Sequence, residues 1–551
     1  MEMTPGQFAG NNQILKYLKS LEARISRIEA HLKLQPAQVK EEEGVELKLP
    51  SFSSLSSGDS LEFHIGQFWF AKVGIVVLAF GLVFLLTFPY QNLPVFFPSL
   101  IGYFITAGLF IFGHLWKESF VLVSRYLVGS ALLLLYFSTL RLHYFSAEQT
   151  VSLHSLEIAL LIGAVIIQFV VSLRRKSIYL STMSLAAGYL TAVLAGNAYV
   201  IFVLNTILAF LVVFITLKYQ WMPFFITGII FTYLVHLIWA INNPVLGNQL
   251  HLVSSHPWNL LFLMIYNIIF AGGILFRNKE IPENNPMIAA AFFNCLGAYG
   301  LFLVLTVSKF RQDLGLLHLL ISAVFILMAI IFWVREHSKY STFFYAMFGY
   351  SALSVAIIAQ FASPDFYIWL CWQSLLVIVT AIWFRSKIIV VANFIIYLLI
   401  FISYLIIAGR VSIVSLSFGI VALLSARIMN WKKHRLDLKT ELMRNAFLAT
   451  AFFIIPYSLY HAVPSRMVIL AWAAVALTYY LISILLNNKK YRWMALFTML
   501  LTAAYLLVIG VARLEPMFRI ISLLAVGILL LIISLLYTKY RSKSSPEQAV
   551  K

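Results

Sequence analysis

The sequence predicts an all-α integral membrane protein with about 18 transmembrane helices in a hairpin-built bundle, preceded by a short N-terminal coiled-coil helix. Three observations support this fold class. Hydrophobic residues make up 62% of the 551 residues and charged residues 11%, whereas soluble domains have about 25% charged residues. Long apolar runs recur along the chain, and the basic residues gather in alternate connections between them. A soluble globular protein and a disordered one are both excluded.

The segment before the membrane domain is polar and has three predicted parts. Residues 1–12 are predicted to be a disordered N-terminus, residues 13–34 a cytoplasmic coiled-coil-like helix, and residues 35–62 a flexible linker rich in Glu and Ser. The apolar residues of the helix step by four and three along the chain, which is typical of a coiled-coil seam: Ile14, Leu18, Leu21, Ile25, Ile28 and Leu32. We expect this helix to self-associate or to bind a protein partner. The alternative is a solvated amphipathic helix resting on its own bundle or on the membrane.

Residues 63–537 are predicted to form a polytopic transmembrane domain. A spanning helix needs about 20 mostly apolar residues, and such runs occur at 68–88, 98–116, 121–140, 156–173, 178–196, 200–217, 221–240, 258–276, 287–307, 314–334, 343–362, 367–384, 388–408, 411–429, 445–461, 466–487, 493–511 and 517–537. Only helices of this length satisfy their own backbone polar groups in lipid. The short connections between the runs predict up-and-down hairpins.

The basic residues predict the orientation of these spans. When the N-terminus is taken as cytoplasmic, the inner connections and the tail carry 25 Lys and Arg residues, and the outer connections carry 7. Basic residues favour the cytoplasmic side, so both termini are predicted to be cytoplasmic, including a basic tail at residues 538–551. Residues 431–444 alternate apolar and basic side chains, which predicts a short helix lying on anionic lipid. The net charge of +19 therefore reflects topology, and no nucleic-acid partner is predicted.

Basic and imidazole side chains mark several predicted outer ends of spans. Guanidinium groups match phosphate oxygens in pairs, so we interpret them as candidate contacts for an anionic group such as a lipid-linked phosphate. The alternative is ordinary capping and snorkelling at the membrane interface. The candidates are Arg141, His143, His154, Arg410, Arg466 and Arg513.

Polar residues also occur in the middle of predicted spans, and His236, Asn267, Asn294 and Gln373 form the candidate mid-membrane polar site. They are predicted to line a substrate path, and an imidazole there is suited to accept a proton near neutral pH. The alternative is hydrogen bonding between helices, which is worth about 0.6 kcal/mol on average. No predicted span carries a central Asp or Glu, and Glu157, at the start of the fourth span, comes closest. This disfavours ion coupling through a membrane carboxylate.

Standard catalytic and metal-binding motifs are missing from the sequence. There is no phosphate-binding loop, no HExxH and no GxSxG. The two cysteines, Cys295 and Cys371, lie in apolar runs and are interpreted as packing residues. The sequence therefore predicts no catalytic residue, no metal and no cofactor.

Three stretches of the chain resemble a known family. FHIGQFWFAKVGIVVLAFGLVFLLTFPYQN at 63–92 has the aromatic lead, basic residue, Val-Gly-Ile and second Gly of its first span, and 125–145 and 180–194 resemble its third and fifth spans. The family is that of bacterial predicted membrane proteins called domain of unknown function 2339. Where the family tends to show a Gly pair and then Pro, this chain has Ala187-Gly188 and Ala192. The resemblance covers residues 63–195.

The resemblance implies a polytopic protein of the bacterial cytoplasmic (inner) membrane and fits a coil before the bundle. It implies no activity, cofactor or catalytic residue. Three functions are compatible with these observations. The first is a transporter or flippase-like protein that handles a lipidic or lipid-linked envelope substrate. The second is a non-catalytic scaffold for envelope machinery, and the third is an integral membrane transferase.

Overall fold

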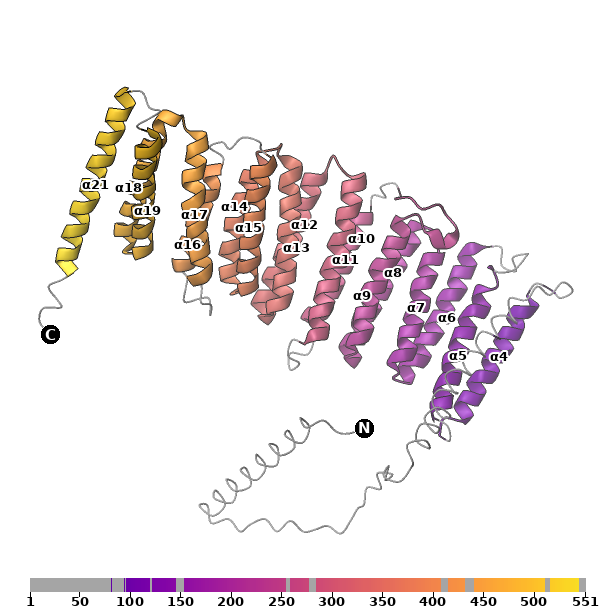
Figure 1. Ribbon diagram of the computed structural model, residues 1–551. Helices are drawn as coiled ribbons and strands as arrows, with labels where there is room; N and C mark the ends of the chain where they lie inside the picture. Colours follow the sequence, from indigo (N-terminus) through magenta and orange to yellow (C-terminus); the bar gives the residue numbers. More distant parts are fainter. Residues whose placement is uncertain are drawn as a thin grey trace, which may run out of the picture. The chain divides into compact units, whose positions relative to one another are not determined.

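The computed structural model describes residues 81, 94, 96–118, 121–144, 153–253, 258–276, 284–407, 415–431, 441–510 and 516–544. These residues belong to one compact unit, and they form helices and no strands. Seventeen α-helices follow one another in this described part of the chain, in the order that Figure 1 shows. The first nine are α4 (Phe97–Leu115), α5 (Val121–Leu140), α6 (His154–Arg174), α7 (Ile178–Leu194), α8 (Ala198–Tyr219), α9 (Met222–Ala240), α10 (Asn259–Leu275), α11 (Asn285–Lys309) and α12 (Leu314–Glu336).

The remaining helices complete the unit toward the C-terminus. They are α13 (Lys339–Gln360), α14 (Phe366–Trp383), α15 (Lys387–Ile407), α16 (Ser415–Trp431), α17 (Glu441–Ala462), α18 (Val468–Leu486), α19 (Lys489–Tyr505) and α21 (Pro516–Ser544). Short helical turns are η2 (Pro244–Leu246), η4 (Ser465–Met467) and the π-helical η5 (Leu506–Gly510).

The all-α membrane fold predicted from the sequence is confirmed, because seventeen of the eighteen predicted runs coincide with helices. Among the residues that the structure describes, thirteen helices are long and apolar enough to cross a membrane, and four shorter apolar helices accompany them: Ile178–Leu194, Asn259–Leu275, Ser415–Trp431 and Pro516–Leu529. The predicted coil at 13–34, the linker at 35–62 and the run at 68–88, apart from Gly81, lie outside the described residues. The last helix continues through residues 538–544, which were predicted to belong to the tail.

Local sequence signals explain where several helices begin. The side chains of Ser177, Asn197, Asn284, Ser338 and Asn488 accept hydrogen bonds from backbone N–H groups of the following turn. A first-turn N–H group has no partner within its own helix, so these caps satisfy donors that the helix itself leaves free. Successive helices form hairpins.

The order of the helices in space follows their order in the chain (Figure 1). Among the described residues, every substantial contact between α-helices joins a helix to one of the next two along the chain. Small residues permit the closest approaches. A Cβ atom at Gly228 would lie 2.5 Å from Cγ1 of Val212, and one at Gly297 would overlap the ring of Tyr233. Glycine at these helix contacts therefore sets the spacing of α8, α9 and α11.

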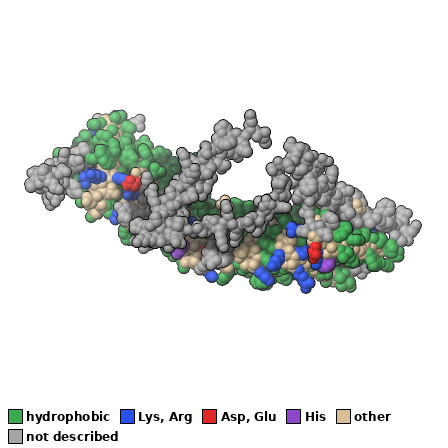
Figure 2. All heavy atoms as spheres, turned by 90° about the horizontal axis from the view of Figure 1, so that it is seen from below, with side chains coloured by type: hydrophobic (Ala, Val, Ile, Leu, Met, Phe, Trp, Pro, Cys, Tyr) green, Lys and Arg blue, Asp and Glu red, His purple; other side chains and the backbone are tan. Residues whose placement is uncertain are grey.

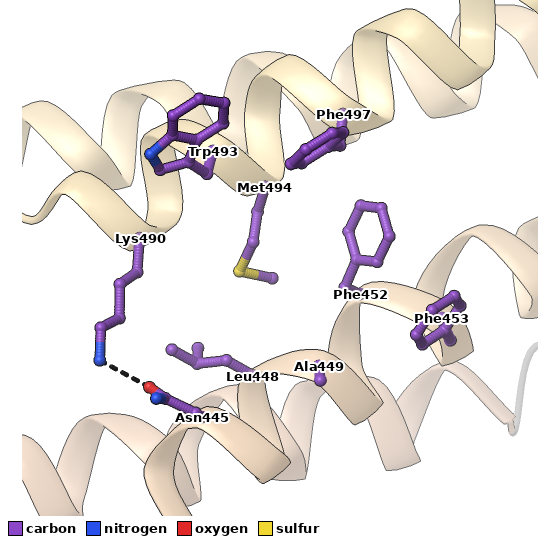
Figure 3. Close-up of a pocket in the computed structure, with 9 residues that line it drawn as sticks. All are labelled: Asn445, Leu448, Ala449, Phe452, Phe453, Lys490, Trp493, Met494 and Phe497. Atoms are coloured by element: carbon purple, nitrogen blue, oxygen red, sulfur yellow. Dashed lines mark hydrogen bonds between the residues drawn. The ribbon is translucent and has the colours of Figure 1, made fainter. Parts of the chain in front are cut away.

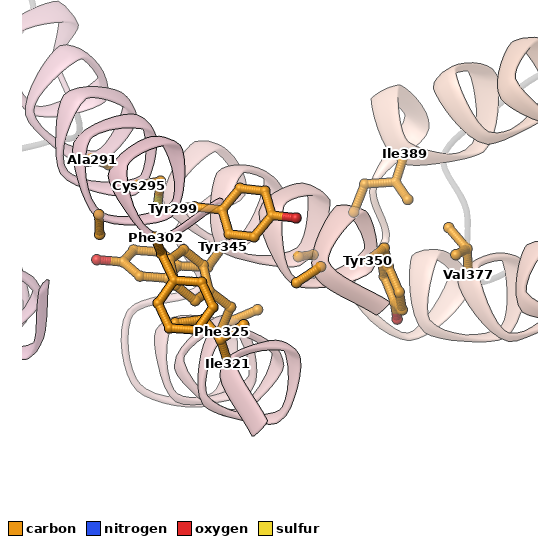
Figure 4. Close-up of a cluster of buried hydrophobic side chains, with 14 of the residues drawn as sticks. Ala291, Cys295, Tyr299, Phe302, Ile321, Phe325, Tyr345, Tyr350, Val377 and Ile389 are labelled. Carbon is orange, nitrogen blue, oxygen red and sulfur yellow. The ribbon is translucent and has the colours of Figure 1, made fainter. Parts of the chain in front are cut away.

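The core between α11, α12 and α13 is aromatic (Figure 4). Tyr299 and Phe302 of α11 and Phe325 of α12 are buried, and Tyr345 of α13 is fully buried beside them. The rings of Phe325 and Tyr345 have centroids 5.6 Å apart, within the range of favourable aromatic pairs. The Tyr345 hydroxyl accepts a 2.8 Å hydrogen bond from the Asn294 side chain on α11, whereas the buried Tyr299 hydroxyl has no partner among the described residues.

One face of the helix array is basic, and we call it the basic face. Figure 2 shows this face, where Lys and Arg side chains gather and Asp and Glu are few. The helix ends that meet there carry basic residues at their termini, including Arg174, Lys218, Lys339, Lys387 and Lys490. We call the other ends of the helices the opposite face. This segregation of charge is what the alternation of basic connections in the sequence predicts.

Candidate functional site

Three ionisable side chains meet where α5 ends and α6 begins, on the opposite face. His143 lies in the turn that follows α5, His154 is the first residue of α6, and Glu157 lies one turn further along. We call these three residues the α5–α6 cluster. Nδ1 of His143 is 3.7 Å from Oε2 of Glu157, and Nδ1 of His154 is 3.6 Å from the same oxygen. One carboxylate oxygen therefore faces two imidazole nitrogens.

Burial makes the carboxylate of this cluster unusual. The Glu157 side chain is 0% exposed, while that of His154 is 41% exposed. Neither oxygen of Glu157 has a hydrogen-bond donor within bonding distance among the described residues. A buried charge is costly unless it is paired and hydrogen-bonded, and nearly all buried polar groups in proteins have a partner. The two histidines are the groups positioned to compensate it.

The orientation of His154 is set by a third helix. Nε2 of His154 lies 3.3 Å from the carbonyl oxygen of Ala195, at the end of α7. A carbonyl only accepts hydrogen bonds, so Nε2 carries the proton and donates it. In the neutral ring Nδ1 then keeps its lone pair, and this lone pair points toward Glu157. In that neutral form, two acceptors would face each other at 3.6 Å.

A tyrosine completes the surroundings of the cluster. The Tyr144 ring packs edge-on against His143, with centroids 5.0 Å apart. Burial raises the pKa of the Tyr144 phenol above its ordinary value, and the Glu157 charge raises it further. The phenol therefore stays protonated and uncharged at neutral pH.

The six predicted anion contacts separate into three groups. The structure brings His143 and His154 together, and Arg141, two residues before His143, is buried at 5% exposure. Arg466 lies elsewhere, exposed in η4, with its guanidinium 5.3 Å from the centroid of the Phe518 ring. Arg410 and Arg513 lie outside the described residues.

The predicted mid-membrane polar residues are buried, and Asn294 is bonded to several neighbouring helices, while both side-chain polar atoms of Asn267 have no partner among the described residues. Asn294 of α11 accepts a hydrogen bond of 2.7 Å from the Tyr233 hydroxyl. It donates to the Tyr345 hydroxyl at 2.8 Å and to the backbone carbonyl of Asn267 at 3.0 Å. Four helices, α9, α10, α11 and α13, are thus joined through one amide. We call this set the Asn294 network.

His236 and Gln373 have other partners. Nε2 of His236 lies 2.6 Å from Oδ1 of Asn259 on α10, and the imidazole stacks on Phe202 with centroids 5.2 Å apart. Gln373 of α14 donates to the backbone carbonyl of Tyr350 at 2.8 Å and accepts from Ser354 at 3.1 Å, both on α13. The structure therefore joins Asn267 to Asn294 but places Gln373 in a separate contact. These hydrogen bonds join neighbouring helices to one another.

A groove between α17 and α19 was not predicted from the sequence (Figure 3). It has a volume of about 220 Å³. Its walls are apolar and aromatic: Leu448, Ala449, Phe452, Phe453, Trp493, Met494 and Phe497. At its end on the basic face, Nζ of Lys490 donates a 2.6 Å hydrogen bond to Oδ1 of Asn445. A cation thus lies at the mouth of an apolar groove.

Sequence reasoning missed Glu157, Lys490 and Asn445 as site residues, for different reasons. His154 and Glu157 are three residues apart at the start of a helix, and this spacing places two side chains on one face. The sequence spacing therefore indicated that His154 and Glu157 lie close together. His143 comes near them only because α5 and α6 pack side by side. Lys490 and Asn445 are separated by a further helix, and no pattern in the chain links them.

The fold and these sites define a polytopic α-helical membrane protein whose polar groups lie at helix ends and between spans. The chain belongs to the family described as Predicted membrane protein (DUF2339), whose family model matches residues 66–469. The match extends far beyond residues 63–195, which carried the resemblance in the sequence. Neither a curated protein nor a solved structure matches the chain.

Proposed function

We propose that this protein handles an anionic lipid, as a transporter or flippase-like protein of the bacterial inner membrane. The observation that carries the proposal is the groove between α17 and α19, which combines a cation at its end with apolar walls. A lipid with a phosphate group has the complementary distribution of charge and apolar surface. The basic face would then be the cytoplasmic side, and both termini would be cytoplasmic.

The geometry of the groove suits one lipid chain entering from the side. Phe453 is 70% exposed, Trp493 60% and Phe497 52%, so the aromatic wall opens toward the surrounding lipid. Small-molecule pockets in proteins measure about 300–1,000 Å³, and the groove, at about 220 Å³, is smaller. It therefore fits a segment of one acyl or prenyl chain rather than a whole lipid.

The head group would be held at the end on the basic face. The Lys490 ammonium has three donors, and one of them is directed at Asn445. Arg444 lies beside Asn445 in the chain and pairs with Glu441 at 3.1 Å. Each basic residue near an anionic membrane surface contributes about 1 kcal/mol to lipid attraction. Lys490 is the basic residue that lines the groove itself.

The test compares lipid retention by two charge variants. We expect Lys490→Gln to weaken retention of an anionic lipid about fivefold, the equivalent of about 1 kcal/mol. The matched control is Lys339→Gln, which removes a lysine from the first turn of α13, away from the groove. Native mass spectrometry of the protein in nanodiscs containing phosphatidylglycerol and a polyprenyl phosphate measures how much of each anionic lipid the two variants retain. Equal retention by the two variants would contradict the proposal.

A second variant tests the apolar part of the site, and liposomes test movement of the lipid. Ala449→Phe places a bulky ring in the groove wall and should displace the chain while leaving Lys490 intact. Proteoliposomes with a fluorescent anionic lipid then report whether the lipid crosses the bilayer. Binding without crossing would contradict transport and leave lipid recognition standing.

The scaffold interpretation depends on residues 13–34, which lie outside the described residues. Deleting residues 1–60 separates it from the proposal. A lipid transporter whose groove is made by α17 and α19 should keep lipid retention and movement after this deletion. A scaffold that assembles through the predicted coil should lose its function in cells. The transferase interpretation stays a prediction that concerns the opposite face.

A further inference from the structure

We propose that the α5–α6 cluster is a divalent metal site of the zinc class, with Nδ1 of His143, Nδ1 of His154 and Oε2 of Glu157 as its ligands. Each of the three residues offers a ligand atom within 4.8 Å of those of the other two. Two imidazoles and one carboxylate form a donor set typical of zinc, with ligand distances of about 2.0–2.2 Å. The site lies on the opposite face, apart from the lipid groove, and is independent of the proposed lipid function.

The separations between the ligand atoms support coordination. The two histidine–carboxylate distances are 3.6 and 3.7 Å, which is too long for a hydrogen bond. Two ligands of one tetrahedral zinc ion lie about 3.3–3.6 Å apart, given the usual metal–ligand distances. A metal ion between these atoms would therefore need only small movements of the side chains.

The second argument comes from the buried carboxylate. Both oxygens of Glu157 are buried and lack a hydrogen-bond donor among the described residues. A bound cation supplies the compensation that a buried carboxylate requires. In the neutral form of His154, the cation would also take the Nδ1 lone pair that faces the carboxylate.

The third argument is the support around His154. Histidines that bind metals usually donate their other ring N–H to a carbonyl or carboxylate, which fixes the tautomer and the ring orientation. Nε2 of His154 has this contact, to the carbonyl of Ala195 at 3.3 Å. Since α7 holds that carbonyl at its C-terminal end, three elements of the fold cooperate in presenting the ligands.

The ligand count indicates the kind of site. Structural zinc sites usually have four protein ligands, whereas three protein ligands leave one position for water or a substrate group. Two neutral imidazoles and one carboxylate leave a zinc site with one net positive charge. The fourth position would therefore favour an anion, such as a phosphate or carboxylate oxygen. His154, at 41% exposure, leaves a side from which such a group can approach.

The experiment measures zinc on the full-length protein without a histidine tag, in nanodiscs. After treatment with a chelator, the protein is dialysed against zinc, and bound metal is counted by inductively coupled plasma mass spectrometry. We expect one zinc ion per chain, and affinity at least about tenfold lower in His143→Ala, His154→Ala and Glu157→Gln. His251→Ala, an exposed histidine outside the cluster, is the matched control and should bind as the wild type does.

Two further readouts guard against misfolded variants. Zinc should raise the unfolding temperature of the wild type and of His251→Ala, but not of Glu157→Gln. Cobalt bound to the unmutated protein should show the intense visible absorption of a four-coordinate ion. The proposal is overturned by zinc content that is equal in the wild type and Glu157→Gln, or by a wild type that binds no zinc above the buffer level.

Discussion

The α5–α6 cluster and the Asn294 network both bury polar side chains, but they satisfy them in different ways. In the Asn294 network, neutral groups from four helices donate and accept at 2.7–3.0 Å. In the cluster, a buried carboxylate faces two imidazoles at 3.6 and 3.7 Å. The Asn294 amide is thus satisfied by hydrogen bonds within the protein, whereas the cluster has the donor set and the spacing of a site that takes a ligand.

This comparison teaches how polar residues of a membrane protein can be sorted. An ionisable or polar residue in a span is a functional hypothesis by default. From the sequence alone, the residues of the cluster and those of the network both count as candidates for a functional site. Hydrogen bonds between spans contribute modestly, about 0.6 kcal/mol on average, and they fix which helices are neighbours. The ionisable groups of the cluster lie at a helix end, at the separations of two ligands of one metal ion. Helix packing does not explain this arrangement, and metal binding does.

The largest expected effect concerns the helix contact beneath the Asn294 network. Gly297→Ala places a methyl group against the ring of Tyr233, and this overpacking should cost about 1–3 kcal/mol of unfolding free energy. Gly300→Ala is the control, because no heavy atom lies within 4 Å of a Cβ built there. Unfolding in detergent measures the unfolding free energy of both variants and of the wild type. Equal stability of the two variants would show that α9 and α11 move apart easily, and would contradict a tight contact between them at Gly297.

The next effect is the strength of one bond within the network. Tyr233→Phe, Asn294→Leu and the double variant form a cycle that isolates the hydroxyl–amide hydrogen bond. We expect a coupling free energy between about 0.6 and 1.7 kcal/mol, as for hydrogen bonds between membrane helices. Additive effects, with a coupling near zero, would mean that the network does not hold these helices together.

The smallest expected effect concerns the cluster in the absence of metal. In protein kept in a chelator, Glu157→Gln should change the unfolding free energy by less than about 0.5 kcal/mol, the least that one hydrogen bond contributes, because no hydrogen bond to the carboxylate is lost. The amide removes a buried charge, which offsets the loss of any attraction to the histidines. A loss as large as that of Asn294→Leu would instead make the cluster a structural network of the same kind.

Much of the fold was predictable because the bilayer imposes a simple rule on the sequence. A helix must be apolar over about 20 residues to span it, so seventeen predicted runs coincide with helices. Their ends are set by residues such as Ser177 and Asn284, which cap the first turn. These signals are local, and local signals can be read from a chain without knowing its neighbours.

The site was predictable only in part. His143 and His154 were recognised as candidates because imidazoles near a helix end are chemically conspicuous. Glu157 was noted only as an acidic residue near a span, since its burial depends on how α5 and α6 pack. The pairing of Lys490 with Asn445 was missed, because α18 separates the two helices in the chain.

The sequence by itself therefore determined the class of fold, the positions of the described spans and the alternation of basic connections. It did so because each depends on side-chain hydrophobicity or charge within about 20 neighbouring residues. Only the tertiary structure decided that the helices lie in chain order, that Asn294 joins four of them and that Gln373 belongs elsewhere. It alone brought His143 and Ala195 to His154, because contacts between helices depend on packing at distant positions.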